Sequence, residues 1–269
     1  MEINAKSKML QIIKQRKKNY KKLLRQYKQD SNFLLGDHQN RALGVPEDFD
    51  FNALSGEFFR QKNPQGFPMP LTNETFKKLR DLPKRAINSF FAENNNGKNI
   101  FGQYMVGVIN KKPILFAFSV VIDQKDSNKF SVKLDACIRG KDWINLSRFD
   151  AEGEPHPNYI TPDGKIVTDP EQIEMCQTPH MHINSQEAQV LFADSLDYST
   201  AIHIPPEKIC ETSDQKQFLI KSVELFMESQ NINETLNEKI FDGSKTYMQD
   251  LFEPKDQKFL YKASDVKEW

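Results

Sequence analysis

The segment Phe130-Ser-Val-Lys-Leu-Asp-Ala136 decides the fold that this sequence predicts. Its apolar side chains, at positions 130, 132, 134 and 136, alternate with polar side chains at positions 131, 133 and 135. Successive side chains of a β-strand point to opposite faces of a sheet. This period of two therefore predicts a strand with one buried face.

Three neighbouring segments extend this strand into a sheet. Ile100–Ile109 and Ile114–Ile122 precede it and are rich in β-forming residues, and Asp142–Phe149 follows it. Short polar turns separate the four segments. Because short connections join antiparallel neighbours, we expect an antiparallel meander.

The residues before the sheet have apolar spacings that predict helices. Apolar residues recur three, four and seven positions apart in Lys6–Lys28, which is typical of an amphipathic helix, and Glu47–Gln61 has a shorter pattern of this kind. Thr72 is expected to cap a third helix, with Glu74 in its first turn. We therefore expect residues 1–96 to be mostly helical.

Pro83 is expected to interrupt that third helix. A second helical piece is expected through Ala86, Ile87, Phe90 and Phe91, because these apolar residues have helical spacing. The run Asn94-Asn-Asn-Gly97 is expected to end it, since glycine commonly follows a helix.

The segments after the sheet predict a long loop, short strands and C-terminal helices. The whole pattern indicates an α+β protein, with a helical N-terminal region over 1–96 and an antiparallel-sheet domain with C-terminal helices over 97–269. The segments concerned are the loop Ala151–Thr178 with a hairpin at Tyr159–Val167, strands at Pro179–Ile183, Val190–Phe192 and Ala201–Ile204, and helices at Ser213–Ser229 and Ile232–Leu251.

Charge is distributed unevenly although the formal net charge is zero. Ten basic and two acidic side chains fall within residues 1–30, so this segment carries 10 − 2 = +8. A basic helix can be a solvated face, or it can contact a phosphate backbone or a neutralising partner protein. The candidate substrate-binding residues are Lys14, Lys17, Lys18, Lys21 and Arg25.

Cysteine usage and hydropathy indicate the cellular compartment in which the protein is expected. The three cysteines are far apart and form no C-x-x-C pair, which argues against a disulfide framework or a zinc knuckle. No apolar run is long enough for a membrane span, and the charged first residues do not resemble a signal peptide. We expect a cytoplasmic protein that does not contact a membrane.

The most informative polar residues lie between Ser147 and Asn184. This stretch holds three of the five histidines. His180 and His182 are two residues apart on an expected strand, so both imidazoles point to one face, with Cα atoms roughly 6.5 Å apart. Prolines flank His156 on both sides and restrict its backbone.

Arg148 and Asp150 are likewise two residues apart, at the end of an expected strand. An arginine in this position can hold a phosphate group through two parallel hydrogen bonds. An aspartate can orient a histidine or pair with the arginine. Together with the three histidines, these two side chains are the candidate catalytic residues.

Three interpretations of these residues remain open. The histidines can act as general acid and base on RNA, with Arg148 stabilising the developing charge and without a metal or other cofactor. Alternatively, His180 and His182 bind a metal with a third group. Glu187 follows at a spacing that resembles the first half of a cupin metal motif. In the third interpretation, the histidines brace a long loop and the protein is a binding or interaction module.

A family resemblance favours the first interpretation. The order Arg148-x-Asp150, then Pro-His156, then Pro-His180-x-His182 resembles a group of short, uncharacterised prokaryotic and phage-associated domains. That pattern is in turn similar to TumE-type toxins of toxin–antitoxin systems. The resemblance covers about residues 97–232. It implies a toxin-like or phage-defence ribonuclease with a neutralising antitoxin-like partner.

Overall fold

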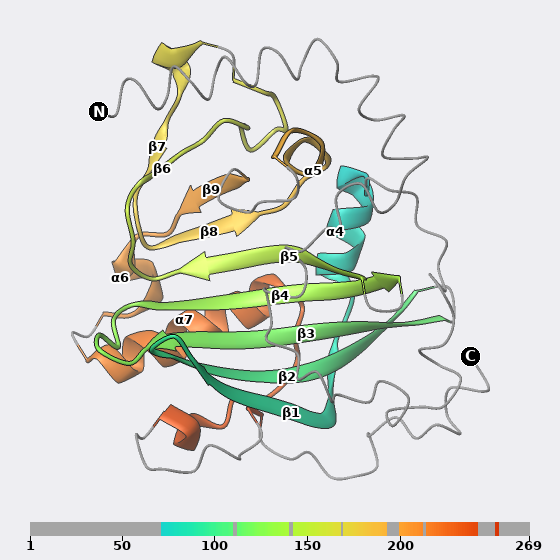
Figure 1. Cartoon of the computed structure of the whole chain (residues 1–269), viewed down its shortest axis with the longest axis vertical. Helices are drawn as coiled ribbons and strands as arrows, with labels where there is room; N and C mark the ends of the chain where they lie inside the picture. Colours follow the sequence, from blue (N-terminus) through green and yellow to red (C-terminus); the bar gives the residue numbers. More distant parts are fainter. Residues whose placement is uncertain are drawn as a thin grey trace.

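The fold is built around one antiparallel sheet. The computed structural model describes residues 71–109, 112–139, 142–167, 169–192, 199–211, 214–241 and 251–252. In these residues seven strands form a single sheet in the order β1-β2-β3-β4-β5-β8-β9 (Figure 1). The strands are β1 (Arg85–Asn95), β2 (Lys98–Ile109), β3 (Lys112–Asp123), β4 (Phe130–Arg139), β5 (Asp142–Asp150), β8 (His180–Ile183) and β9 (Thr200–His203).

The four strands from β2 to β5 confirm the expected meander. Each pairs with the next in antiparallel register, and Phe130 of β4, for example, lies opposite Ile122 of β3. β8 continues the sheet beside β5, and β9 pairs with β8. The expected strands at Pro179–Ile183 and Ala201–Ile204 are thus confirmed to within one residue at each end.

The expected fold class, with its helical N-terminal region, is wrong. The described residues are mainly antiparallel sheet with a few short helices, and most of these helices follow β5 in the sequence. Of the described part of the supposed helical region, only α4 (Asn73–Asp81) is a helix, whereas residues 85–95 form β1. The helices expected at Lys6–Lys28 and Glu47–Gln61 lie outside the described residues.

Two local features explain why β1 resembles a helix in sequence. The pairing of β1 with β2 shifts between Ala86 and Phe90, and this irregularity displaces the alternating pattern so that apolar residues fall at helical spacing. The Asn96-Gly97 pair has φ angles of 51° and 77°, and Asn95 pairs with Lys98. It is therefore a two-residue hairpin turn and not the end of a helix.

Helix α4 forms as its sequence predicts. The Thr72 side chain accepts a hydrogen bond from the backbone N–H of Thr75, and the helix ends before Pro83. The fully buried Lys84 follows. Its Nζ atom donates to the carbonyl oxygens of Arg80, Leu82 and Gln230 at 2.7, 2.8 and 2.6 Å, which joins α4 to the end of α7 (Gln215–Ser229).

The two faces of the sheet differ in character. One face, with Phe116, Phe118, Val132 and Leu134, packs against α4 and α7 (Gln215–Ser229) in the main hydrophobic core. Figure 1 shows these two helices lying against the sheet. The other face begins with a smaller aromatic cluster around Tyr104 and becomes polar towards β5 and β8. The functional candidates lie on this second face.

The C-terminal expectations are confirmed in part. Helix α7 ends at Ser229 as expected, but its N-cap is Asp214. The segment expected as a strand at Val190–Phe192 belongs to a helix, α5 (Gln186–Phe192). Within the described part of the helix expected at Ile232–Leu251, only the 3₁₀ turn η4 (Glu238–Phe241) forms.

The shorter elements complete the description. They are the two-stranded sheet β6 (His156–Pro157) and β7 (Met175–Cys176), the 3₁₀ turn η2 (Pro170–Gln172) and the helix α6 (Pro206–Ile209). None of the helices in the described residues is long and apolar enough to cross a membrane.

Candidate metal centre

Strands β5 and β8 bring four of the five candidate catalytic residues together. In their antiparallel register, Asp150 lies opposite His180 and Arg148 lies opposite His182. Paired residues of antiparallel strands present their side chains on the same face. Arg148, Asp150, His180 and His182 therefore form one patch, as their spacing of two predicts.

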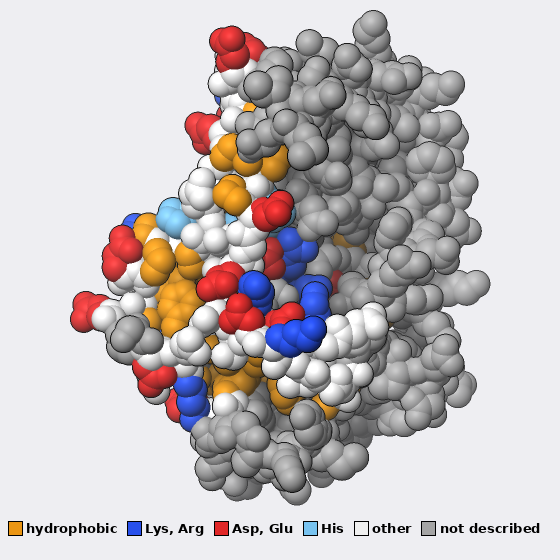
Figure 2. Space-filling view, turned by 60° about the vertical axis from the view of Figure 1, so that its left-hand side comes forward, with side chains coloured by type: hydrophobic (Ala, Val, Ile, Leu, Met, Phe, Trp, Pro, Cys, Tyr) orange, Lys and Arg blue, Asp and Glu red, His pale blue; other side chains and the backbone are white. Residues whose placement is uncertain are grey.

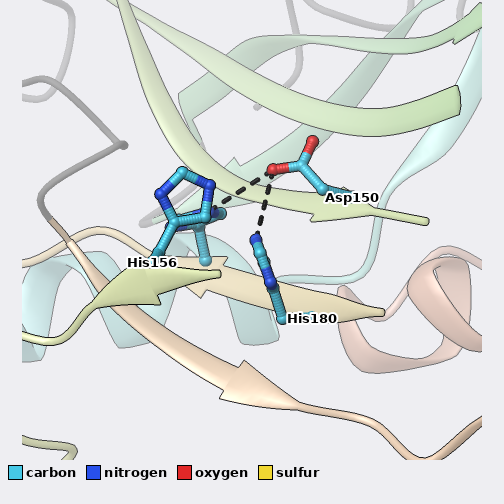
Figure 3. A group of neighbouring side chains, drawn as sticks. Asp150, His156 and His180 are labelled. Atoms are coloured by element: carbon cyan, nitrogen blue, oxygen red, sulfur yellow. Dashed lines mark ion pairs between the residues drawn. The ribbon is translucent and has the colours of Figure 1, made fainter. Parts of the chain in front are cut away.

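His156 completes the patch from a separate layer. It lies on β6, which pairs with β7 and not with the main sheet. The centroid of its ring is 4.9 Å from that of His180 and 5.1 Å from that of His182, and the last two rings are 4.7 Å apart. Figure 3 shows Asp150, His156 and His180 pointing towards one another from different strands.

A side chain that the sequence analysis overlooked holds the His156 segment in place. Asn158 donates from Nδ2 to the carbonyl oxygen of Ala201 and accepts from the Ala201 N–H, each at 2.8 Å. The Thr200 hydroxyl also donates to the carbonyl oxygen of Ile160 at 2.9 Å. These contacts attach the loop that carries His156 to β9, the strand next to β8.

The Asp150 carboxylate is the centre of charge in this patch. Its Oδ2 atom accepts a hydrogen bond from Nε of Arg148 at 2.7 Å. Burial acts to raise the pKa of Asp150, but the hydrogen bond and the positive charge of Arg148 oppose it and favour the carboxylate. Asp150 is therefore a carboxylate near neutral pH.

The protonation of His180 follows from its hydrogen bond. Its Nδ1 atom lies 3.2 Å from the carbonyl oxygen of Gln177. A carbonyl oxygen can only accept, so we infer that Nδ1 carries a proton; in the neutral form of the ring Nε2 then carries a lone pair. Nε2 lies 3.6 Å from Oδ2 of Asp150 and has no hydrogen-bond partner.

His182 is in a similar position. Its Nε2 atom lies 3.4 Å from Oδ2 of Asp150 and also lacks a hydrogen-bond partner, while its Nδ1 atom lies 3.4 Å from the hydroxyl of Ser199. The ring is completely buried. Burial lowers the pKa of His182 to about 4, despite the opposing effect of Asp150, so the ring is neutral at pH 7.

These four side chains have the chemistry and spacing of a metal-binding group. Asp150, His156, His180 and His182 each offer one ligand atom, and these atoms lie within 4.8 Å of one another. Ligands bound at 2.0–2.1 Å in a tetrahedron are about 3.4 Å apart, close to the two Nε2–Oδ2 distances. The Nδ1–H of His180 bound to a backbone carbonyl matches the usual arrangement behind a metal-binding imidazole.

Other residues on this face add charge beside the cluster. Lys133 of β4 lies opposite Arg148 in the register, and Asp135 is fully buried two residues further along the strand. Burial raises the pKa of Asp135 to about 7, although Lys133 and Asn145 act to lower it. Figure 2 shows acidic and basic side chains intermixed on the face in view, where histidines also reach the surface.

The remaining sequence-based candidates lie elsewhere or outside the described residues. Glu187 is on α5, where its carboxylate accepts from Asn73, so the resemblance to a cupin motif does not extend to the geometry. His203 is exposed, and its Nδ1 atom lies near the carbonyl oxygens of Gln177 and Pro179. The basic residues Lys14, Lys17, Lys18, Lys21 and Arg25 are outside the described residues.

Comparison of the chain with protein-family models, with curated proteins and with solved structures finds no match. The function is therefore inferred from the site itself.

Proposed function

We propose that the protein is a metal-dependent hydrolase of phosphodiesters, with RNA as the favoured substrate. The main observation in favour of a bound metal is that two hydrogen-bond acceptors, Nε2 of His180 and Oδ2 of Asp150, face each other. Two acceptors facing each other in a buried place repel unless a cation lies between them. A proton would draw them to about 2.7–2.9 Å, so their 3.6 Å separation suits a larger cation.

Each residue of the cluster has a distinct role in this proposal. His156, His180 and His182 hold the ion, and the three imidazoles favour zinc or a similar transition metal. Oδ2 of Asp150 faces the same place as a fourth ligand, and because it also accepts from Arg148 it would be the weakest of the four and could give up the ion to accept a proton from a coordinated water. A bound ion of this kind would lower the pKa of that water and polarise a phosphoryl oxygen.

The substrate and biological role are supported by chemistry and resemblance. Arg148 lies beside the cluster, where a guanidinium can stabilise the charge that develops on a phosphoryl group. The resemblance to TumE-type toxins favours RNA and a toxin-like or phage-defence role with a neutralising partner protein. The interpretation without a metal shares this substrate but assigns the histidines to acid–base catalysis.

The first experiment measures metal and activity together. Purified protein, His180→Ala, His182→Ala and the control His203→Ala are analysed for bound metal and for cleavage of labelled RNA. We expect about one metal ion per chain in the wild type and in His203→Ala, little in the other two variants, and RNA cleavage that chelator abolishes and zinc or manganese restores.

The possible results separate the alternatives. Cleavage that survives complete chelation but disappears in His180→Ala would reject the metal and support acid–base catalysis. Bound metal without turnover, with four protein ligands in the X-ray absorption spectrum, would indicate a closed structural site. Wild-type metal content and activity in both histidine variants would reject the site altogether.

A further inference from the structure

A pocket of about 240 Å³ lies on the opposite face of β8 and β9 from the metal-binding cluster. It is bounded by α4, by the hairpin at residues 160–164, and by the ends of β8 and β9. Ile183 and Ile202 contribute apolar wall, and Ile202 is 41% exposed at the rim. The pocket is too small for a drug-sized molecule but can admit a small metabolite.

Arg80 is the positive charge in this wall. Its guanidinium makes one long hydrogen bond, 3.4 Å from Nη1 to the carbonyl oxygen of Asn184. Within the described part of the chain, no carboxylate lies at ion-pair distance from it. A guanidinium has five N–H donors, so most of the donors of this half-buried group are available to a ligand.

The other polar side chains of the wall are already satisfied. The Asn73 side chain bonds the backbone N–H of Gln186 and the carboxylate of Glu187. Asp163 pairs with Lys165, at 2.6 Å, and with the hydroxyl of Thr161. A ligand would therefore meet the Arg80 guanidinium, which feels the nearby Asp81 carboxylate without an ion pair to it, and an apolar surface.

We propose that this pocket binds a small organic carboxylate with a branched apolar body, and that this binding is coupled to the metal-binding cluster. A carboxylate matches the planar fork of one guanidinium and its single charge. The isoleucine side chains match the apolar body. The first part of the proposal stands on the pocket alone, and the coupling rests on the proposed function.

The coupling follows from shared segments. Ile183 directly follows His182, and Thr200 lies between Ser199, which contacts His182, and Ala201, which holds Asn158. A ligand that orders these residues on one face orders the metal ligands on the other. By thermodynamic reciprocity, the carboxylate ligand changes the affinity for metal by the same factor by which metal changes the affinity for the carboxylate.

The binding test uses metal-free, full-length protein and two matched probes, isovalerate and its neutral isostere isovaleramide. Isoleucine methyl NMR signals are followed during titration, with Ile202→Val used to assign the rim methyl. We expect saturable shifts with isovalerate in the millimolar range, and at least tenfold weaker binding of isovaleramide. Arg80→Gln should weaken isovalerate at least tenfold, whereas Lys78→Gln, a change outside the pocket on the same helix, should not.

Several outcomes would overturn this proposal. They are absence of saturable shifts, equal binding of acid and amide, or wild-type affinity in Arg80→Gln. Arg80→Lys keeps the charge and guards against misfolding, and its affinity should fall between those of the wild type and Arg80→Gln.

Coupling is tested by titrating zinc with and without isovalerate. We expect the zinc affinity to change at least twofold, and an unchanged affinity would reject the coupling. Failure of zinc to bind at all would reject the proposed function and would leave the carboxylate pocket standing.

Discussion

His180 presents its Nε2 atom to Oδ2 of Asp150 at 3.6 Å, across the pairing of β8 with β5. The proton of the ring is held on the other side, where Nδ1 faces a backbone carbonyl oxygen. We therefore predict that ¹⁵N NMR of metal-free protein at pH 7.5 shows the Nδ1–H tautomer for His180. Addition of zinc should shift the Nε2 resonance and leave Nδ1 protonated. A signal from the Nε2–H tautomer would contradict the proposed ligand geometry.

Arg148 is predicted to matter for turnover more than for metal binding. Arg148→Ala removes the 2.7 Å hydrogen bond to Asp150 and the guanidinium beside the cluster. Because a donor aimed at developing charge typically contributes about 10²–10³ to the rate, kcat on RNA should fall by roughly that factor. Metal content measured on the same sample should stay near one ion per chain. Loss of the metal in this variant would show that Arg148 maintains the site itself.

Asn158 is predicted to support the third imidazole. Asn158→Ala removes both hydrogen bonds to Ala201 and frees the segment that carries His156. Groups that orient metal ligands usually contribute about 10–100-fold to affinity, so zinc affinity should fall by about tenfold or more. Asn99→Ala, which removes a 2.9 Å hydrogen bond from Nε2 of Gln124, just after β3, to Asn99 on β2, is the control and should retain full affinity. Equal affinities in the two variants would remove Asn158 from the site.

The metal-free protein is predicted to lose stability in acid in two steps. The pKa of His182 is about 4 in the folded state against about 6.5 when unfolded, so the unfolded chain binds more protons between these values. Stability is therefore intact above pH 6.5 and decreases by about 3 kcal/mol as the pH falls to 4. Asp150, whose pKa is also lowered, adds a further loss below pH 4. Urea unfolding of wild type and His182→Asn checks this, because the loss between pH 6.5 and 4 should be much smaller in the variant.

Lys84 is predicted to be required for stability and not for activity. Lys84→Met would leave three carbonyl oxygens without a donor in a fully buried place, which should cost about 3 kcal/mol or more in the free energy of unfolding. The matched control is Lys78→Met, which removes an exposed ion pair with Glu74 and should cost less than about 1 kcal/mol. Similar urea midpoints for the two variants would contradict the structural role of Lys84.

Much of the fold can be predicted from local sequence patterns. The main error of that prediction, a helix in place of β1, also has a local cause. The alternation around Phe130 and the turns beside it predict the meander, because each strand has one face in the main core. The first strand could not be recognised by spacing, since the irregularity after Ala86 changes its phase. The Asn96-Gly97 pair is a signal for a hairpin, but glycine also commonly follows the end of a helix.

The candidate site was only partly predictable for a similar reason. Spacing of two placed His180 with His182 and Arg148 with Asp150, because strand geometry fixes which residues share a face. The approach of His156 depends on a contact between residues 158 and 201, and no local pattern reveals so distant a partner. The Gln177 carbonyl and the Ser199 hydroxyl were missed because backbone groups and single serines carry no sequence signal.

The Asn158 amide has one more consequence. Among the described strands β9 lies at the edge of the seven-stranded sheet, and an unpaired edge strand is a template on which another chain can add. The side chain of Asn158 occupies both the donor and the acceptor of Ala201, much as a neighbouring strand would. The loop that delivers an imidazole to the cluster thereby also shields the sheet from self-association, so solubility and metal binding should deteriorate together when that loop is altered.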